Sequence, residues 1–311
     1  MANTIGTNAS VGNTYTDPGR YYDRRFLERL EPNVVLKQCG DMRPLPQKSG
    51  TLVKWHRLNT LAVATTALTE NTTPSEATVG TSEVSVEPLT YGSWVKVSAE
   101  LNLKSINPIV EEIQDAQADQ AAKTYDRIIF NALNGNVTDQ FAGGAASEAA
   151  VADTDVLNAA ELRKAVYNLR KNHVPGYEGN MFKMVIDPAS QFDMLSDTAG
   201  GALIEASKYT TFDKVMKGEI GSLYGAKIVV SNHLPTGTGA TDDTYRAFLF
   251  GRQAFGITEL AQHGVKTFRY KDGSTENPLN MYSTIGWKFM MAAVVLEAAR
   301  AIQIYSGSAA D

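Results

Sequence analysis

Two segments between residues 51 and 101 alternate apolar and polar side chains. The first is Thr51-Leu52-Val53-Lys54-Trp55-His56-Arg57, and the second includes Glu83-Val84-Ser85-Val86-Glu87. A period of two is typical of strands that bury one face. Residues 59–80 between them are mostly Thr, Ala, Glu, Ser and Pro. The pattern predicts a long hairpin with a polar tip, and the alternative is a disordered surface loop over residues 59–80.

A hairpin of this kind needs a surface to pack against. An isolated two-stranded hairpin is only marginally stable in water, so we expect other copies of the chain to complete its faces. This expectation favours assembly over catalysis. The candidate interface residues on the hairpin are Trp55, Leu61, Val63 and Leu68. Trp55 and the threonine-rich tip are expected to have no partners within their own chain.

A long helix is predicted after the hairpin. Asn107 is the expected N-cap and Pro108 the first helical residue, and Asn134-Gly135 predicts a left-handed end. A helix of roughly 26 residues is about 39 Å long, well above the average. Its apolar face is mostly small, so a flat partner can lie close to it; this face comprises Ala118, Ala121, Ala122, Tyr125, Ile128, Ile129 and Ala132.

The middle of the chain interleaves helix and strand patterns. Asn158-Ala159-Ala160-Glu161 resembles a capping box and predicts a helix, and a second helix is expected from Pro188. Interleaved helices and strands predict a layered α/β subdomain. Residues 137–154, before this unit, predict a linker or a surface insertion. The expected strands are Phe182–Ile186, Tyr224–Val230 and Ala247–Phe250.

Residues 280–305 return to an extended pattern. We expect a long strand, a break near Ala298 and a short final strand. A helix over residues 292–304 is the alternative, because this stretch is rich in alanine. If strands form, the segment is expected beside the hairpin base and the long helix, so that the chain starts and finishes in the same layer.

The N-terminal part predicts an arm with a docking helix. Residues 1–19 are rich in Gly, Asn, Thr and Ser and predict a flexible arm. Tyr22, Phe26 and Leu30 follow at i, i+4 and i+8, which places them on one face of a short helix. These three residues complete the candidate interface. The arginines on the other faces are either solvated or paired with acids, or they contact packaged nucleic acid or an acidic partner.

Composition excludes several classes of protein. The net charge of −5 argues against a broad nucleic-acid-binding face, which needs many basic contacts with phosphates. The longest apolar run, residues 289–296, is far shorter than the roughly 20 residues of a membrane span, and no signal segment is expected. The single cysteine, Cys39, cannot form an internal disulfide and indicates a reducing compartment, with pairing between chains left open.

Candidate chemistry is sparse. The four histidines, His56, His173, His233 and His263, are far apart in sequence and match no metal-binding spacing. The turn-like Thr236-Gly237-Thr238-Gly239 lacks the lysine of a phosphate loop. The sequence therefore predicts no catalytic, cofactor-binding or metal-binding residue, and an enzyme is not expected.

Four runs of residues in a fixed order carry a resemblance to a known family. They are Tyr21-Tyr22-Asp23-Arg24-Arg25-Phe26-Leu27-Glu28-Arg29, Leu89-Thr90-Tyr91-Gly92-Ser93-Trp94-Val95, Phe212-Asp213-Lys214-Val215-Met216-Lys217-Gly218-Glu219-Ile220-Gly221 through Ser231, and Asn277-Pro278-Leu279 through Lys288. Together they resemble the major capsid (coat) proteins of tailed bacteriophages with the Hong Kong 97 fold, in the branch typified by the coat protein of phage N4. The resemblance spans residues 21–305, without residues 137–154.

This resemblance implies an α+β fold with a defined domain order. The implied parts are an N-terminal arm with a short amphipathic helix (1–48), an extended β-hairpin loop (49–98), a long spine helix and insertion in the peripheral domain (99–154), an inserted α/β axial domain (155–264), and C-terminal strands of the peripheral domain (265–311).

The implied function is structural. Such coat proteins self-assemble as hexamers and pentamers into an icosahedral shell around double-stranded DNA, in a virion assembled in the host bacterial cytoplasm. The implied partners are copies of the chain, decoration or cement, scaffolding and portal proteins, and packaged DNA in weak non-specific contact, without a membrane. The alternatives are a non-viral compartment shell of the same fold, or a phage tail or decoration protein.

Overall fold

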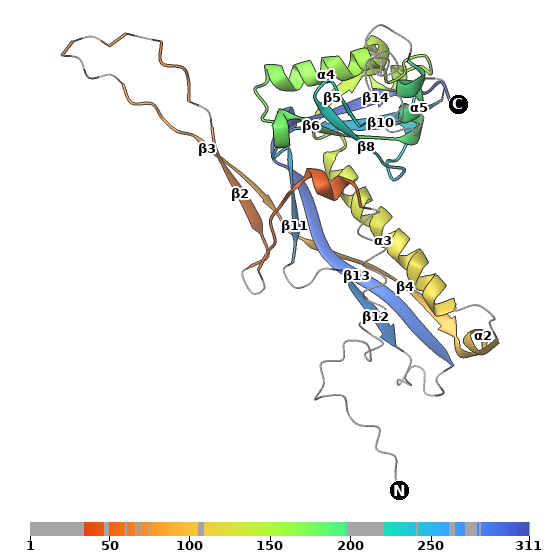
Figure 1. The fold of residues 1–311 in the computed structure, drawn as a ribbon. Coiled ribbons are helices and arrows are strands. Elements are labelled where there is room, and N and C mark those ends of the chain that lie inside the picture. Colours follow the sequence, from red (N-terminus) through yellow and green to blue (C-terminus); the bar gives the residue numbers. More distant parts are fainter. Residues whose placement is uncertain are drawn as a thin grey trace.

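The computed structural model shows two β-sheets, one long helix and a projecting hairpin (Figure 1). The first 33 residues of the predicted arm, with Tyr22, Phe26 and Leu30, lie outside the described residues. The structure describes residues 34–46, 50–59, 61–65, 67–68, 70–71, 73, 75–104, 109–197, 221–240, 242–260, 265–270, 279 and 281–310.

The long helix α3 spans Ile109–Leu133, as predicted. The predicted cap at residues 105–108 lies outside the described residues, whereas Gly135 adopts φ 73° and confirms the left-handed end. The small residues Ala118, Ala121 and Ala122 are completely buried. Ile128 and Ala132, which were expected on the same face, are only half-buried. The small-residue face therefore lets α3 lie close to the sheet beneath it.

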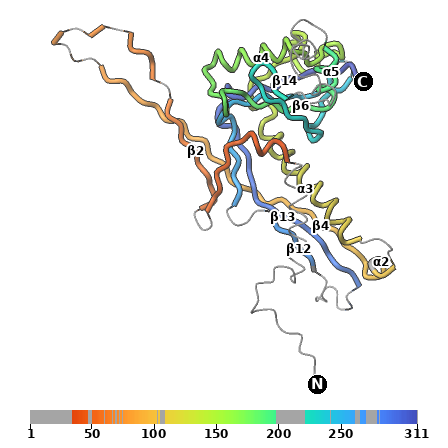
Figure 2. Tube along the Cα trace, viewed as in Figure 1, coloured from red at the N-terminus to blue at the C-terminus, as the bar shows by residue number. Residues whose placement is uncertain are grey.

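That sheet has five strands and is built around β13 (Tyr282–Val295). Figure 2 shows β13 running alongside α3. The neighbours of β13 are β4 (Leu89–Ser98), β12 (Lys266–Tyr270) and β11 (Phe255–Glu259), all antiparallel to it, and β1 (Asp41–Met42) adds to β11 in parallel. The short helix α2 (Ala99–Lys104) follows β4, and the 3₁₀ turn η1 (Leu36–Cys39) precedes β1.

The second sheet has seven strands and carries two helices. Asn158 caps α4 by accepting hydrogen bonds from the backbone N–H groups of Ala160 and Glu161, as the capping box predicts. The helices are α4 (Ala159–Lys171) and α5 (Pro188–Ser196), and the strands are β5 (Thr138–Phe141), β6 (Phe182–Ile186), β7 (Ser222–Leu223), β8 (Ala226–Val230), β9 (Gly237–Thr238), β10 (Asp243–Phe250) and β14 (Ala301–Ser306).

Strand β10 joins the two hydrophobic cores of the molecule. Ala247 and Leu249 pack with the side chains of α4, whereas Phe248 and Phe250 pack with the C-terminal half of α3. Successive residues of a strand point to opposite faces, so one strand can serve both cores. The end of α3 is thereby held against the seven-stranded sheet, and Gln303 of β14 donates a hydrogen bond to Asn134 just beyond the helix.

Three predicted boundaries differ from the structure. Residues 137–154 are not a linker, because β5 pairs in parallel with β14 in the seven-stranded sheet. The break near Ala298 is present as the turn η5 (Ala298–Arg300), but β14 after it leaves the layer of β13. The described part of the chain therefore has its first strand, β1, in the five-stranded sheet and its last, β14, in the seven-stranded sheet. Conversely, β11 lies within residues 155–264 yet belongs to the five-stranded sheet.

A buried carboxylate connects three parts of the chain. Asp126 of α3 accepts hydrogen bonds from the backbone N–H groups of Val35 and Leu36, at 3.2 and 3.1 Å. His233, in the loop after β8, lies 3.2 Å from the same side chain through Nδ1. Burial raises the pKa of Asp126, and these three contacts act in the opposite direction by favouring the charged form.

Cys39 is expected to be unreactive in the folded chain. Its side chain is buried, and burial raises the pKa of its thiol to about 12. At pH 8, alkylation of the native chain should be on the order of 10³-fold slower than alkylation of the unfolded chain, because the thiolate is the reactive form. The measurement is iodoacetamide labelling followed by mass spectrometry, with guanidinium-unfolded chain as control. Rapid labelling of the native chain would contradict the burial of Cys39.

Candidate assembly surfaces

The predicted hairpin is formed by β2 (Val53–Leu58) and β3 (Thr81–Val86). Their antiparallel register pairs Val53 with Val86 and Leu58 with Thr81. One further bond, from the N–H of Asn59 to the carbonyl of Gly80 at 2.9 Å, closes this ladder. The described residues between 61 and 79 belong to no strand. The hairpin thus has a regular base and a long irregular tip.

The prediction that Trp55 lacks partners in its own chain is wrong. Its side chain is only 6% exposed and packs in a small core with Leu45, Val53 and Val86 of the same subunit. The indole lies directly over Gly256 of β11, where an added Cβ would come within 2.7 Å of the ring. Trp55 therefore anchors the hairpin base to the five-stranded sheet.

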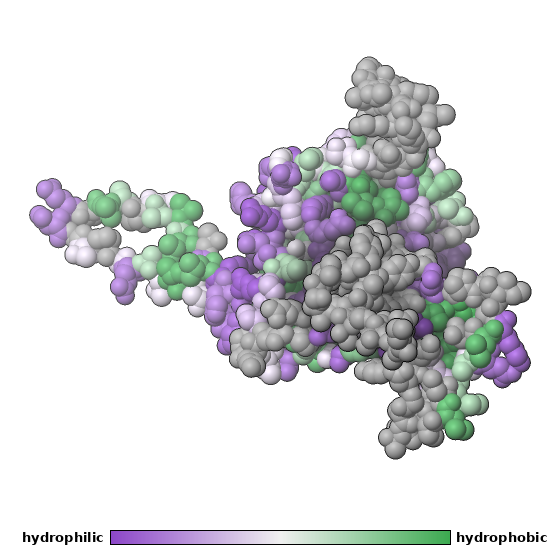
Figure 3. Space-filling view, turned by 60° about the horizontal axis from the view of Figure 1, so that its bottom comes forward, coloured by the Kyte–Doolittle hydropathy of each residue, from purple (hydrophilic) through white to green (hydrophobic). Residues whose placement is uncertain are grey.

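The apolar residues predicted at the hairpin tip are exposed to solvent, which an assembly surface requires. Leu61, Val63 and Leu68 are 50%, 85% and 78% exposed. Figure 3 shows green, apolar residues along the part of the hairpin that projects away from the body. Burying a large aliphatic side chain is worth about 1.5–3 kcal/mol, and these residues leave that gain unused within one subunit. The tip is thus able to stabilise a contact with another molecule.

Sequence reasoning missed further exposed apolar side chains on β4 and α2. Trp94 is 65% exposed, and Leu89, Leu101 and Leu103 are also exposed. Beside Trp94, the sheet carries a groove of about 400 Å³ that includes the ring of Phe268. The available signal was the adjacent pair Trp94-Val95, because a strand buried on one face carries apolar residues only at alternate positions.

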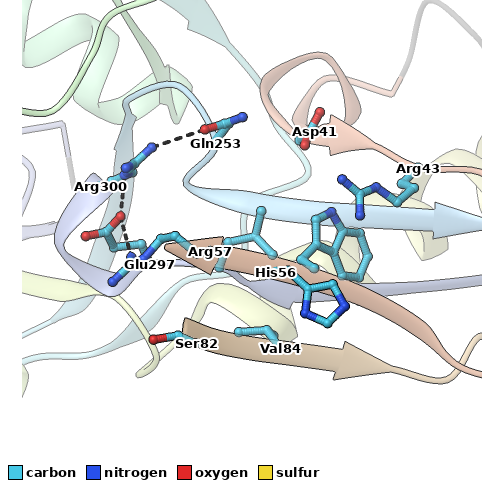
Figure 4. Close-up of a pocket in the computed structure, with 11 residues that line it drawn as sticks. Asp41, Arg43, His56, Arg57, Ser82, Val84, Gln253, Glu297 and Arg300 are labelled. Atoms are coloured by element: carbon cyan, nitrogen blue, oxygen red, sulfur yellow. Dashed lines mark hydrogen bonds and ion pairs between the residues drawn. The ribbon is translucent and has the colours of Figure 1, made fainter. Parts of the chain in front are cut away.

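A charged cleft, called the base cleft below, lies where the hairpin joins the body (Figure 4). Arg57 of β2 reaches Glu297 with Nη1 2.6 Å from Oε2, and Arg300 Nε contacts the same oxygen. Arg300 also donates to the side-chain oxygen of Gln253 at 3.3 Å. These contacts join β2 to the segment that follows β13, so they fix the hairpin base from a second side.

The remaining polar clusters offer little chemistry. His56 is an exposed partner of Glu83, and His233 pairs with the buried Asp126, whereas His263 lies outside the described residues. Among the residues that the structure describes, no three metal-ligating side chains converge. Within the same residues, the helices are too short or too polar to cross a membrane.

Comparisons with known proteins point to one family. The sequence model of the family described as phage capsid protein matches residues 80–304, well over half of the chain. The match begins just before β3 and ends within β14, so it includes α3, the groove beside Trp94 and every strand of the two large sheets except β1 and the end of β14. No protein among the curated ones matches the chain.

Solved structures of similar fold are phage capsids. The cyanophage Pam1 capsid matches with a TM-score of 0.68 and 12% identity, covering 100% of this chain and 99% of that one. The capsid of Ralstonia phage GP4 matches with a TM-score of 0.67 and 15% identity, covering 89% and 92%. The capsid of cyanophage P-SCSP1u matches with a TM-score of 0.66 and 19% identity, covering 89% of both chains. At these identities, the likeness is one of fold.

Trp55 and Trp94 should contribute differently to the stability of the subunit. Trp55→Ala is expected to lower the free energy of unfolding by about 3–5 kcal/mol, because it empties a buried site. Trp94→Ala serves as the matched control and should cost about 1 kcal/mol or less, because the side chain is mostly exposed. Urea unfolding of the full chain, followed by circular dichroism, measures both. Equal losses would contradict the different placement of the two rings.

Proposed function

The chain belongs to the phage capsid protein family, and from this membership we propose that it assembles as hexamers and pentamers into the icosahedral head of a tailed phage. It is a structural protein of the virion capsid rather than an enzyme. Its fold is the α+β capsid fold of the Hong Kong 97 type. The finer assignment to the branch typified by the coat protein of phage N4 belongs to the proposal and rests on the four sequence runs.

The projecting hairpin is the feature that best supports assembly with neighbouring copies of the chain. Its base is fixed to the body through Trp55 and Arg57, while Leu61, Val63 and Leu68 on its tip remain exposed. A rigid base that presents an apolar tip suits a contact with a neighbouring copy, because repeated burial of apolar surface stabilises closed assemblies. We therefore assign the tip to the subunit interface of the shell.

The two sheets receive distinct roles in this proposal. The seven-stranded sheet with α4 and α5 would form the axial domain around the local symmetry axes. The five-stranded sheet with α3 would form the peripheral domain, and the hairpin would be the extended loop that crosses to the next subunit. The division between the two hydrophobic cores supports this assignment.

The further partners follow from the same proposal. Tyr22, Phe26 and Leu30 would dock the arm onto a neighbour, and decoration or cement, scaffolding and portal proteins would bind the shell. Packaged double-stranded DNA would meet it only in weak, non-specific contacts. The net charge of −5 supports this weak contact, because a strongly basic inner wall would hinder the packing and release of DNA. Assembly would take place in the host bacterial cytoplasm.

The full chain, expressed alone and with the genes beside it, tests the shell directly. We expect cryo-electron microscopy to find closed icosahedral particles, or their hexamers and pentamers, with hairpins crossing between subunits. Mass measurement of the particles gives the copy number. Tubes alone, or a discrete small oligomer in every co-expression, would overturn the capsid assignment.

Removing the hairpin tip should abolish assembly without unfolding the subunit. Because Leu58 pairs with Thr81, residues 59–80 can be replaced by a two-residue Asn-Gly turn that preserves the register. We expect a folded chain whose melting temperature falls by only a few degrees and which forms no stable shell. The control replaces Leu61, Val63 and Leu68 by serine, which keeps the tip length and should also weaken assembly. Normal particles from both variants would exclude the tip from the interface.

The arm should contribute to assembly rather than to subunit stability. Phe26→Asp places a charge on the predicted docking face, so particle yield is expected to fall at least about tenfold, which corresponds to about 1.4 kcal/mol. Tyr21→Asp, on a different face of the same predicted helix, is the control. Sucrose-gradient sedimentation measures the yield, and calorimetry measures the subunit. A large drop in melting temperature with normal particle yield would assign Phe26 to the core instead.

A further inference from the structure

The base cleft has a volume of about 150 Å³, enough to hold a small ligand or several waters. Figure 4 places Arg57, Glu297 and Arg300 at one end of the cleft, and Arg43 with His56 at the other. Its walls come from β1, β2, β3 and the segments around Gln253 and Glu297, so every wall except the hairpin belongs to the body of the subunit.

The charges that line the base cleft do not balance. Three guanidinium groups, from Arg43, Arg57 and Arg300, face the two carboxylates of Asp41 and Glu297. Glu297 is shared by Arg57 and Arg300. Arg43 forms no ion pair among the described residues. It donates to the backbone carbonyl of Lys54 at 2.9 Å, and its guanidinium lies 5.5 Å from the centroid of the Trp55 ring.

A buried donor lies beside this guanidinium. Trp55 also lines the cleft, and its indole Nε1 is buried without a hydrogen-bond acceptor among the described residues. The indole N–H can only donate, and a molecule in the cleft can supply the acceptor that the described residues do not. A guanidinium has five N–H donors, and Arg43 uses one of them for Lys54. Arg43 is exposed, so its other N–H groups are open to solvent or to a ligand. An oxygen acceptor in the cleft suits both groups, and Arg43 favours one with negative charge.

We propose that the base cleft binds an oxyanion, the carboxylate or phosphate group of a ligand, between Arg43 and the indole N–H of Trp55. Arginine recognises such planar or tetrahedral oxyanions with two parallel hydrogen bonds. The bound group would bridge the strand β2 and the segment after β1, and so would stiffen the junction at which the hairpin leaves the body.

Two sources can supply this oxyanion. One is an acidic side chain of a second copy of this chain, and the other is a free anion such as inorganic phosphate. The first source rests on the proposed function, because it requires a neighbouring subunit. The site itself does not, because all of its residues come from one chain.

Binding of a free anion can be measured on the indole group itself. The chain has three tryptophans, Trp55, Trp94 and Trp287, so ¹⁵N-tryptophan labelling of the unassembled full chain gives three indole signals, and Trp55→Phe assigns the relevant one. Titration with sodium phosphate and with sodium acetate is expected to shift the Trp55 signal downfield to saturation, with millimolar affinity. The Trp94 signal is the internal reference.

Arg43→Gln should weaken this binding at least about tenfold, which is about 1.4 kcal/mol. Arg43→Lys keeps the charge without the bidentate geometry, so its affinity for the anion should lie between that of Arg43→Gln and that of the wild type. Arg163→Gln is the matched control, since Arg163 also lies over an aromatic ring, that of Tyr224, but on α4. Circular dichroism confirms that each variant is folded.

Assembled particles distinguish the source. After washing in phosphate-free buffer, a cryo-electron microscopy map with a neighbour's carboxylate beside Arg43 identifies the second copy as the source. A saturable shift of the Trp55 signal without such a carboxylate identifies a free anion. Neither a shift at up to about 100 mM anion nor a neighbour's carboxylate in the cleft would overturn the proposal. If shells form but the cleft binds no ligand in either experiment, the anion site is wrong and the capsid assignment stands. If the Trp55 signal shifts but no shells form, the capsid assignment is wrong and the anion site stands.

Discussion

The close contact between α3 and β13 sets the position of everything else in the subunit. Because Ala118, Ala121 and Ala122 carry almost no side chain, the helix lies near the strand, and the rings on β13 fill the space beside them. Trp287 stacks on Phe289 with centroids 5.2 Å apart, and Phe289 in turn meets the ring of Tyr125. β4 pairs with ten successive residues of β13 and leads back into β3. The direction in which the hairpin projects thus follows from how the helix rests on the sheet.

Two buried or half-buried carboxylates, Asp126 and Glu297, add polar contacts to this packing. A carboxylate removed from water is costly unless donors surround it, so Asp126 holds Val35, Leu36 and His233 at defined places around α3. Val35 and Leu36 precede β1, and His233 follows β8 of the seven-stranded sheet. The side chain of Asp126 therefore connects both of these segments to α3. At the hairpin base, Glu297 acts in the same way on Arg57 and Arg300. Each subunit therefore fixes its projecting parts from within before any neighbour is present.

The sequence was informative where local patterns decide the structure. Alternation identified β2 and β3, helical spacing identified α3, and the capping residue Asn158 marked the start of α4. It failed where pairing between distant residues decides, as for β5 and β14, which are about 160 residues apart and carry no mark of their common sheet. The prediction for Trp55 failed for a related reason, because its ring lies over Gly256, which is far away in sequence. Leu61, Val63 and Leu68 could be proposed as interface residues because their neighbours along the chain are polar, and the structure shows that they are exposed.

The position of β14 affects how the chain folds as it is made. This strand lies between β5 and β10, and all six of its residues are buried. It is also the last of the described strands to be synthesised. The edges of β5 and β10 that pair with β14 are therefore unpaired until synthesis is nearly complete. Strand pairing across such long loops is slow, which lengthens the time for which these edges are open to wrong partners. The edges of β5 and β10 are therefore the part of the unfinished seven-stranded sheet that is most open to wrong strand pairing.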